Sequence, residues 1–433
     1  MNFFYLIFLL NIYSTNALEH KILFTNPLCN TPDRAITYCT KSDYNYNIIK
    51  SDGVFQTYVK SLFSAPYTKV IVSYLSFSNT ELTEAYKKLI LKNNPDFTII
   101  LDDPFEDEPD QVRKLLRQPL TYKSFHEEPT SEYLSFKNGS PIRALSEAYE
   151  ILKFAHDNNT SPSPRLLLRG QTDGSGYSHM KMTYLEADND KSLILGSANL
   201  SQGLALHHEN WHFFKDTQDS NFVEVHKCIL DNLIDEPLSY DKSKYARHTT
   251  SCTNQQNDAQ YKTYFTPGQG QKALVDIKKG FEESDEIWIA AHRFSNTQIF
   301  TAIKKALSEN KTVRLLVDDD LYWVEHKRGR YLNSKYEVKK VKPLIKLGLK
   351  IKYLSTNNKE FLLHHNKYII FMKNHRPFKV FTGAGNLTIS AFTRNFENYF
   401  MTNKAEVSSI FANQYKIMWK LAFEANELTS ISE

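Results

Sequence analysis

Two parts of the chain repeat one order of apolar and polar positions. In the first part, a β-branched run at 69–74 precedes the tetrapeptide Phe-Ser-Asn-Thr at 77–80, a helical stretch at 81–91 and a second apolar run at 97–103. In the second part, the same features stand at 287–291, 294–297, 298–307 and 313–320. Short apolar runs bounded by turn residues are typical of buried strands. Each part therefore predicts a strand, a helix whose first turn is capped by Ser, Asn or Thr, and another strand.

Each repeat also ends in a pattern that predicts an amphipathic helix. Apolar residues recur at helical spacing from about Ser220 to Ile234, and again from Glu406 to Phe423. Such stripes bury one face of a helix against a core. Strands that alternate with helices predict an α/β sandwich. We therefore expect an α/β protein of two pseudo-symmetric sandwich domains, with the functional site at their interface.

The spacing of the repeats suggests domain boundaries. We place the first domain at 55–236 and the second at 271–433, joined by a polar linker at 237–270. The first repeat is longer than the second by about 31 residues, which we assign to an insertion at about 104–164. We expect this insertion to cover the site as a lid or to form a peripheral loop-helix unit. Residues 18–54 are expected to run irregularly over the surface of the first domain.

The N-terminus has the pattern of an export signal. Met1 to Ile12 is an apolar run, and small and polar residues follow it as far as Ala17. We expect residues 1–17 to be a signal peptide and the protein to be secreted or periplasmic. An uncleaved membrane anchor is the alternative, because no Lys or Arg precedes the apolar run. An even number of cysteines then predicts two disulfides, against the alternative of four buried thiols, and the simplest pairing is Cys29 with Cys39 and Cys228 with Cys252.

Length and charge narrow the function only a little. The chain has 433 residues, 41% of them hydrophobic, which is enough for two ordinary cores. Its formal net charge of +4 would tolerate a polyanion or an anionic membrane surface but requires neither. The substrate therefore has to be argued from the motifs.

The repeat carries reactive side chains at matching positions. The first copy has His179, Lys181, Asn199 and Glu209, and the second has His365, Lys367, Asn386 and Glu397. Residues i and i+2 of a strand project from one face, so each His points in the same direction as its Lys. Each Asn follows a glycine-containing turn and can present an amide beside them. Two such halves would enclose a phosphodiester between two imidazoles, two ammonium groups and two amides.

This set suits phosphodiester chemistry that needs neither a metal nor a cofactor. One His can attack phosphorus to form a phosphohistidine, while the other protonates the leaving oxygen and then activates water. Glu209 and Glu397 suit the role of accepting a ring N–H from a His, with a surface position as the alternative. Ser197 can bind the substrate phosphate or donate to the backbone. The neighbouring histidines are expected to be solvated or packed and not to bind metal: His207, His208, His212 and His364.

At these residues the chain resembles the phospholipase D superfamily, whose signature is H-x-K-x4-D followed by G-[GS]-x-N. The resemblance covers both halves and implies two α/β domains with the active site between them. It further implies that His179 is the nucleophile and His365 the general acid and base. The chain departs from the signature at Glu186 and Met372, which replace the Asp, and at Ala384, where Gly or Ser is usual. The tyrosyl-DNA phosphodiesterase branch of the family also lacks this Asp, so the departure weakens a phospholipase assignment more than it weakens catalysis.

We predict an exported, metal-independent phosphodiesterase that hydrolyses or transfers phospholipid head groups through a phosphohistidine. We expect it to act as a monomer with peripheral membrane contact. Lipid is preferred because both motifs share one chain and a lid-sized insertion is present, features common among the phospholipases. The main alternative is a secreted or periplasmic nuclease of this family acting on DNA or RNA, favoured by the Lys327-Arg328-Gly329-Arg330 cluster near Trp323. A non-catalytic protein that binds a phosphorylated ligand is a third hypothesis.

Overall fold

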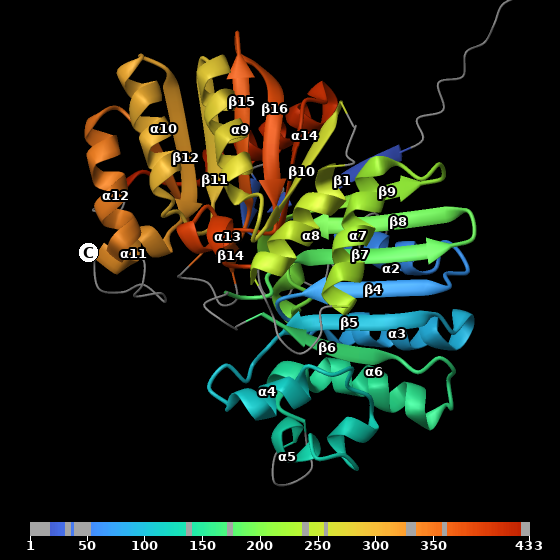
Figure 1. Cartoon of the computed structure of the whole chain (residues 1–433). Coiled ribbons are helices and arrows are strands. Elements are labelled where there is room, and N and C mark those ends of the chain that lie inside the picture. The colour runs from blue at the N-terminus through green and yellow to red at the C-terminus, as the bar shows by residue number, and fades with distance from the viewer. Residues whose placement is uncertain are drawn as a thin grey trace, which may run out of the picture.

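A computed structural model describes most of the chain, with gaps. The described residues are 18–30, 36–38, 53–135, 141–170, 176–235, 242–254, 259–325, 335–356 and 362–425. They form two mixed β-sheets covered by helices, so the expected α/β class with two sandwich-like halves is confirmed (Figure 1). The expected signal peptide, Cys39 and the basic cluster at 327–330 lie outside the described residues.

The first sheet has the strand order β1-β9-β8-β7-β4-β5-β6. Its strands are β1 (Leu18–Thr25), β4 (Lys69–Tyr74), β5 (Asp96–Asp102), β6 (Arg165–Arg169), β7 (Lys181–Ala187), β8 (Asp190–Gly196) and β9 (His207–Asp216). The three strands β4, β5 and β6 are parallel, whereas every pairing from β4 through β7, β8 and β9 to β1 is antiparallel. A small hairpin, β2 (Leu28–Asn30) with β3 (Ile36–Tyr38), follows β1.

The second sheet repeats this order strand for strand as β10-β17-β16-β15-β11-β12-β13. Its strands are β10 (Tyr261–Thr266), β11 (Glu286–Ala291), β12 (Thr312–Asp318), β13 (Lys350–Leu354), β15 (Lys367–Lys373), β16 (Arg376–Gly383) and β17 (Glu397–Thr402). The short β14 (Leu363–His364) leaves the second half and pairs with β9 of the first sheet. The repeat seen in the sequence is therefore a repeat of topology, and the two halves touch at the motif strands.

Strands also lie in the two segments that were expected to be irregular chain and linker. Residues 18–25, expected to be irregular, form β1 and pair along all of their length with β9, so that expectation is wrong there. Residues 261–266, assigned to the linker, form β10, the equivalent edge strand of the second sheet. Residues 18–25 mix polar and apolar side chains without a clear pattern, whereas 261–266 are rich in aromatic and β-branched residues, a strand signal that the linker assignment missed. The rest of the described linker holds the helix α8 (Lys242–Asn254).

The predicted helices are present with nearly the expected bounds. They are α3 (Thr80–Asn93) and α10 (Thr297–Ser308) after the Phe-Ser-Asn-Thr tetrapeptides, and α7 (Asn221–Asp235) and α14 (Ala405–Leu421) at the end of each half. Asn79 accepts a hydrogen bond from the Leu82 amide, and Asn296 accepts from the amides of Gln298 and Ile299. The predicted capping is therefore confirmed, and the tetrapeptide shared by the halves starts a helix in both.

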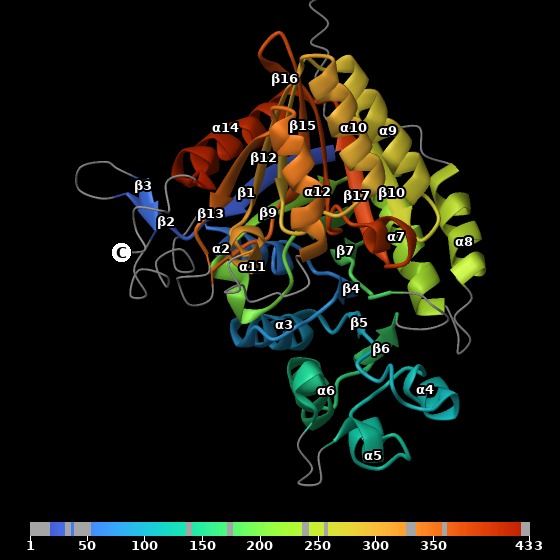
Figure 2. The same cartoon turned by 90° about the vertical axis from the view of Figure 1, so that its left-hand side faces the viewer.

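The remaining helices cover the sheets. They are α2 (Val54–Leu62), α4 (Asp110–Leu116), α5 (Ser131–Leu134), α6 (Ser146–Asp157), α9 (Gly270–Glu283), α11 (Asp320–Glu325), α12 (Lys335–Lys346) and α13 (Ile389–Thr393). Helices α4 and α5 belong to the insertion and lie beyond β6, at the outer edge of the first sheet (Figures 1 and 2). Of the two roles expected for the insertion, the structure shows the peripheral loop-helix unit. Among the described helices, none is both long and apolar enough to span a bilayer.

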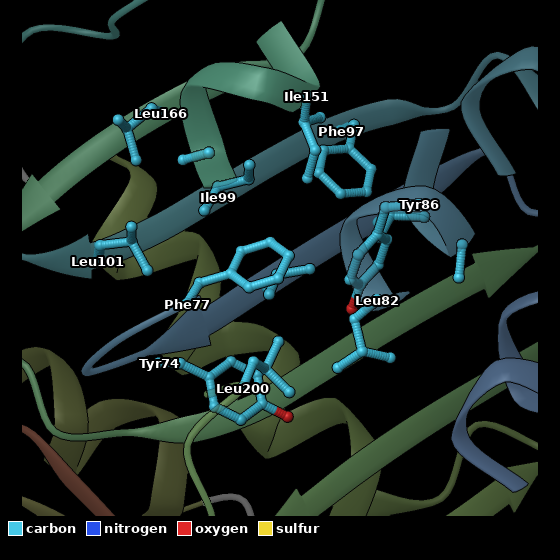
Figure 3. Packing of buried hydrophobic residues seen from close by; sticks show 14 of the residues in the cluster. Tyr74, Phe77, Leu82, Tyr86, Phe97, Ile99, Leu101, Ile151, Leu166 and Leu200 are labelled. Carbon is cyan, nitrogen blue, oxygen red and sulfur yellow. The ribbon is translucent and has the colours of Figure 1, made fainter. Parts of the chain in front are cut away.

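Each strand serves two cores because successive side chains point to opposite faces. Val70 and Val72 of β4 pack with α2, α3 and α6 on one face, where Phe77, Tyr86 and Ile99 also gather (Figure 3). Ile71 between them joins a different cluster, which contains residues of α7 together with Phe396 and Phe400 from the second half. In return, Ile22 and Phe24 of β1 pack against a cluster built around α14. The two halves thus share cores and are not separate bodies on a linker.

Candidate active site

A cavity of about 570 Å³ is lined by residues at strand ends, in the adjoining loops and on α12. Its lining comes from both halves and includes Tyr177, His179, His292, Arg293, Asn386 and Asn395. None of its lining residues comes from the described part of the insertion at 104–164. Of the eight predicted motif residues, His179 of the first copy and Asn386 of the second line this cavity, and the other six do not.

Both motif histidines are placed by backbone bonds that cross between the halves. The His179 amide donates to the carbonyl of Phe396 at 2.9 Å, and the His365 amide donates to the carbonyl of His208 at 3.0 Å. Each His stands two residues before its Lys, at the point where β7 or β15 begins. In each case the partner carbonyl belongs to the opposite half, so the two halves fix the backbone of each other's motif His.

The two glutamates bind the histidines in a crossed arrangement. His179 Nδ1 lies 2.7 Å from a carboxylate oxygen of Glu397, and His365 Nδ1 lies 2.7 Å from Glu209. Each carboxylate therefore accepts the Nδ1–H of the His in the other half, so the lone pair of each neutral ring is on Nε2. A surface position for the glutamates, the alternative reading, is wrong, since their exposed fractions are 1% and 0%.

The lysines lie beside the histidines in a buried setting. Lys181 Nζ is 3.1 Å from Nδ1 and 3.2 Å from Nε2 of His179, and Lys367 Nζ donates to the His365 carbonyl at 2.5 Å. Burial lowers the pKa of Lys181 to about 8 and holds the pKa of Lys367 well below its ordinary range. Two ammonium groups that are poorly solvated form a strong site for an anion.

The histidine rings are held neutral. Burial, followed by the charges of Lys181 and Lys367, keeps the pKa of His179 well below its ordinary value. Burial lowers the pKa of His365 to about 3, with Glu209 opposing that shift. A neutral imidazole with its Nδ1–H bound to a carboxylate has a lone pair at Nε2, which is the form a nucleophile requires.

The motif asparagines and Ser197 differ in what they bind. The Oδ1 atoms of Asn199 and Asn386 are buried and have no hydrogen-bond partner among the described residues. The Ser197 hydroxyl donates to Glu209 at 2.6 Å and accepts from the Asn210 amide at 3.0 Å. The sequence predicts that Ser197 binds the substrate phosphate or the backbone. In the structure its hydroxyl donates to Glu209, the carboxylate that orients His365.

Several positioning residues were missed by the sequence analysis. Asp102 accepts from the Ser178 amide at 2.6 Å, and Asp318 accepts from the His364 amide at 2.7 Å, so each anchors the residue before a motif His. Asn398 accepts from the Lys181 amide, and Asn210 donates to Asn366. The repeat could have identified these residues. Asp ends the equivalent strand in both halves, and the pair Glu-Asn occurs at both 209–210 and 397–398.

The additional histidines pack around the site. His208, His212 and His364 have exposed fractions of 0%, which bears out packing for these three, and His207 lies 3.5 Å from Glu209. The ring of His292 lies 4.9 Å from the ring of His365. Within the described part of the chain, no three His, Cys, Asp or Glu side chains gather as a metal-binding group.

Comparison with known protein families finds a similarity in the second half of the chain. Residues 279–419 match the family model "Cardiolipin synthase, PLD-like domain". The second half is thus similar to a PLD-like domain, which confirms the resemblance to the phospholipase D superfamily over these residues. None of the curated protein sequences matches the chain significantly.

Solved structures extend the likeness to both halves. Phosphatidylserine synthase of Haemophilus influenzae Rd KW20 is 12% identical with a TM-score of 0.57, over 88% of this chain and 87% of that one. Nuc from Salmonella typhimurium, a phospholipase D family member, is 20% identical with a TM-score of 0.31, over 38% of this chain and 95% of its own. A variant of yeast tyrosyl-DNA phosphodiesterase is 11% identical with a TM-score of 0.46, over 89% and 91%. At these identities the likeness concerns the fold alone.

Proposed function

We propose that this protein is a phosphodiesterase that cleaves phospholipid head groups through a phosphohistidine on His179. The observation that carries the proposal is the crossed pairing, in which His179 and His365 are each oriented at Nδ1 by a buried glutamate of the opposite half. His179 lines the cavity and is the proposed nucleophile, and His365, held by the equivalent glutamate, is the proposed proton donor. Lys181, Lys367 and the two motif asparagines supply the charge and the amide donors for the oxygens of the phosphate.

The reaction proceeds in two balanced steps. His179 Nε2 attacks phosphorus in line, a P–N bond forms, the P–O bond to the leaving alcohol breaks, and His365 transfers a proton to that oxygen. His365 then takes a proton from water, whose oxygen attacks phosphorus and releases His179. An alcohol in place of water would give head-group transfer. A bound anionic phosphate opposes the effect of burial on the pKa of His365 and so favours its protonated form.

The rim of the cavity supports lipid over nucleic acid. Tyr177 and Tyr336 line the cavity with exposed fractions of 51% and 46%. Ile389, between the lining residues Thr388 and Ser390, is 44% exposed. Tyrosines could stack on bases, but an exposed isoleucine cannot, whereas all three suit the interfacial region of a bilayer. Export, through residues 1–17, is part of the same proposal, since such a rim would meet a membrane surface.

The test uses two histidine variants and a substrate with a good leaving group. Bis(p-nitrophenyl) phosphate needs little help from an acid, so His365→Ala should release one equivalent of p-nitrophenol quickly and accumulate a phosphohistidine. His179→Ala should lose turnover by about 10⁴-fold or more and form no adduct. His375→Ala, in a side chain that is 97% exposed, is the matched control and should behave as wild type.

The class of natural substrate is tested by incubating the protein, in buffer with EDTA, with mixed phospholipid vesicles or with single-stranded DNA. Free head group is the expected product. Shortened DNA strands with intact lipid would instead establish the nuclease alternative. The third hypothesis, a non-catalytic binding protein, predicts no turnover of bis(p-nitrophenyl) phosphate, phospholipid or DNA. It also predicts that the His179→Ala variant still binds phosphorylated ligands.

A further inference from the structure

The cavity is not symmetric, although the halves that form it are. Leu75-Ser76 in the first half and His292-Arg293 in the second precede the equivalent Phe77 and Phe294. Leu75, His292 and Arg293 all line the cavity. The second half thus places a guanidinium where its counterpart has a serine, on one side of the proposed phosphate site only.

Arg293 is held in a fixed orientation. Its Nε donates to Glu337 Oε1 at 3.1 Å, and the side chains are 17% and 4% exposed. Glu337 also accepts from the Phe294 amide at 3.0 Å, which fixes the carboxylate to the backbone next to Arg293. Burial raises the pKa of the Glu337 carboxyl, and the charge of Arg293 opposes that shift.

The charge of Arg293 is additional to what the scissile phosphate needs. Lys181 and Lys367 already supply two cations for one monoanionic diester, and both are buried at the motifs. A planar guanidinium held at one edge matches a carboxylate or a phosphate in two-point contact. Arg293 and its partner Glu337 both line the same cavity as His179 and Asn386.

We propose that Arg293, oriented by Glu337, recognises a second anionic group, a carboxylate or phosphate, in the head group next to the scissile phosphodiester. This rests on the proposed phospholipid cleavage and specifies its substrate as a lipid with an anionic head group. Arg293 is then a specificity residue, and a lipid without that group is a poor substrate.

The experiment compares two short-chain lipids that differ by one carboxylate. Dihexanoyl phosphatidylserine and dihexanoyl phosphatidylethanolamine are assayed with wild type and Arg293→Gln, and bis(p-nitrophenyl) phosphate serves as a diester with no second anion. We expect Arg293→Gln to lower kcat/KM for the serine lipid by about 10- to 100-fold and to change the other two by less than about 2-fold. Arg293→Lys should recover part of the loss, and Glu337→Gln should raise KM for the serine lipid alone.

Arg394→Gln is the matched control. It removes the same charge next to Asn395, but from an exposed side chain that does not line the cavity, and it should leave all three substrates unchanged. A loss of equal size on all three substrates in Arg293→Gln would show a structural role and overturn the proposal. Equal use of the two lipids by wild type would overturn it as well, and so would an Arg293-dependent cleavage of oligothymidylate in place of lipid.

A binding measurement separates this inference from the proposed function. Calorimetry with His179→Ala compares glycerophosphoserine with glycerophosphoethanolamine, and so requires no turnover. Tighter binding of the serine compound that disappears in the His179→Ala/Arg293→Gln double variant supports the subsite even if catalysis fails. Equal binding of the two compounds contradicts it even if catalysis is found.

Discussion

Glu209 and Glu397 occupy equivalent positions but differ in their partners. Glu209 accepts from Ser197 and His365, and His207 lies close by. Glu397 accepts from Asn395 and His179, because Ala384 stands where the first half has Ser197. Although burial alone would raise it, His365, His207 and Lys367 hold the pKa of Glu209 well below its usual range. Burial raises the pKa of Glu397 to about 8.

The pKa of Lys181 predicts that activity decreases at alkaline pH. Its pKa, lowered by burial, is about 8, so the cation that would bind the phosphate is lost as pH rises through that value. We expect kcat/KM for bis(p-nitrophenyl) phosphate to fall above about pH 8, measured from pH 6 to pH 10. Lys181→Met should be slower by about 10²-fold and should not show this decrease. A wild-type profile that stays level to pH 9.5 would contradict the assignment.

At the scale of elements, the edge strands complete the site. In the registers of β1 with β9 and of β10 with β17, Thr25 lies opposite Glu209 and Thr266 lies opposite Glu397. Thr25 accepts from the indole of Trp211, and Thr266 donates to the carbonyls of Ala391 and Asn395. The segments that precede each half therefore support the strands on which the glutamates lie.

The disulfide between Cys228 and Cys252 also connects two elements of the fold. It joins α7 to α8 across a sequence separation of 24, as the sequence predicted. Closing a loop of this size restricts the unfolded chain, so the Cys228→Ser/Cys252→Ser variant should lose about 3 kcal/mol of unfolding free energy, measured in guanidinium. Reduction of the wild type should produce a similar loss. A midpoint unchanged by both treatments would show that the link adds no stability.

At the scale of the whole molecule, burial keeps several histidine side chains neutral. Burial lowers the pKa of eight of them in the described chain: His20, His179, His208, His212, His226, His292, His364 and His365. Below pH 6.5 the unfolded chain binds protons at these positions and the folded chain does not. Stability must therefore decrease as pH falls through that range.

This predicts early acid unfolding. Each such histidine contributes about 1.4 kcal/mol per pH unit below 6.5, so the melting temperature should drop steeply between pH 6.5 and pH 5. Calorimetry across that range measures it, and His212→Gln, away from the cavity lining, should make the drop less steep. A melting temperature that is constant from pH 7 to pH 5 would show that the rings are not buried as described.

The sequence by itself determined the α/β class, the repeated strand–helix–strand unit, the capping of a helix by Ser, Asn or Thr of each tetrapeptide, and the identity of the motif side chains. These features depend on patterns within a few residues of each other, which local geometry imposes wherever the chain folds. Only the tertiary structure decided which glutamate holds which histidine, because the pairs His179–Glu397 and His365–Glu209 are 218 and 156 positions apart. Their pairing depends on how the two halves are oriented against each other. The difference between Ser76 and Arg293 is already in the sequence, but only the structure shows that Arg293 lines the cavity of His179.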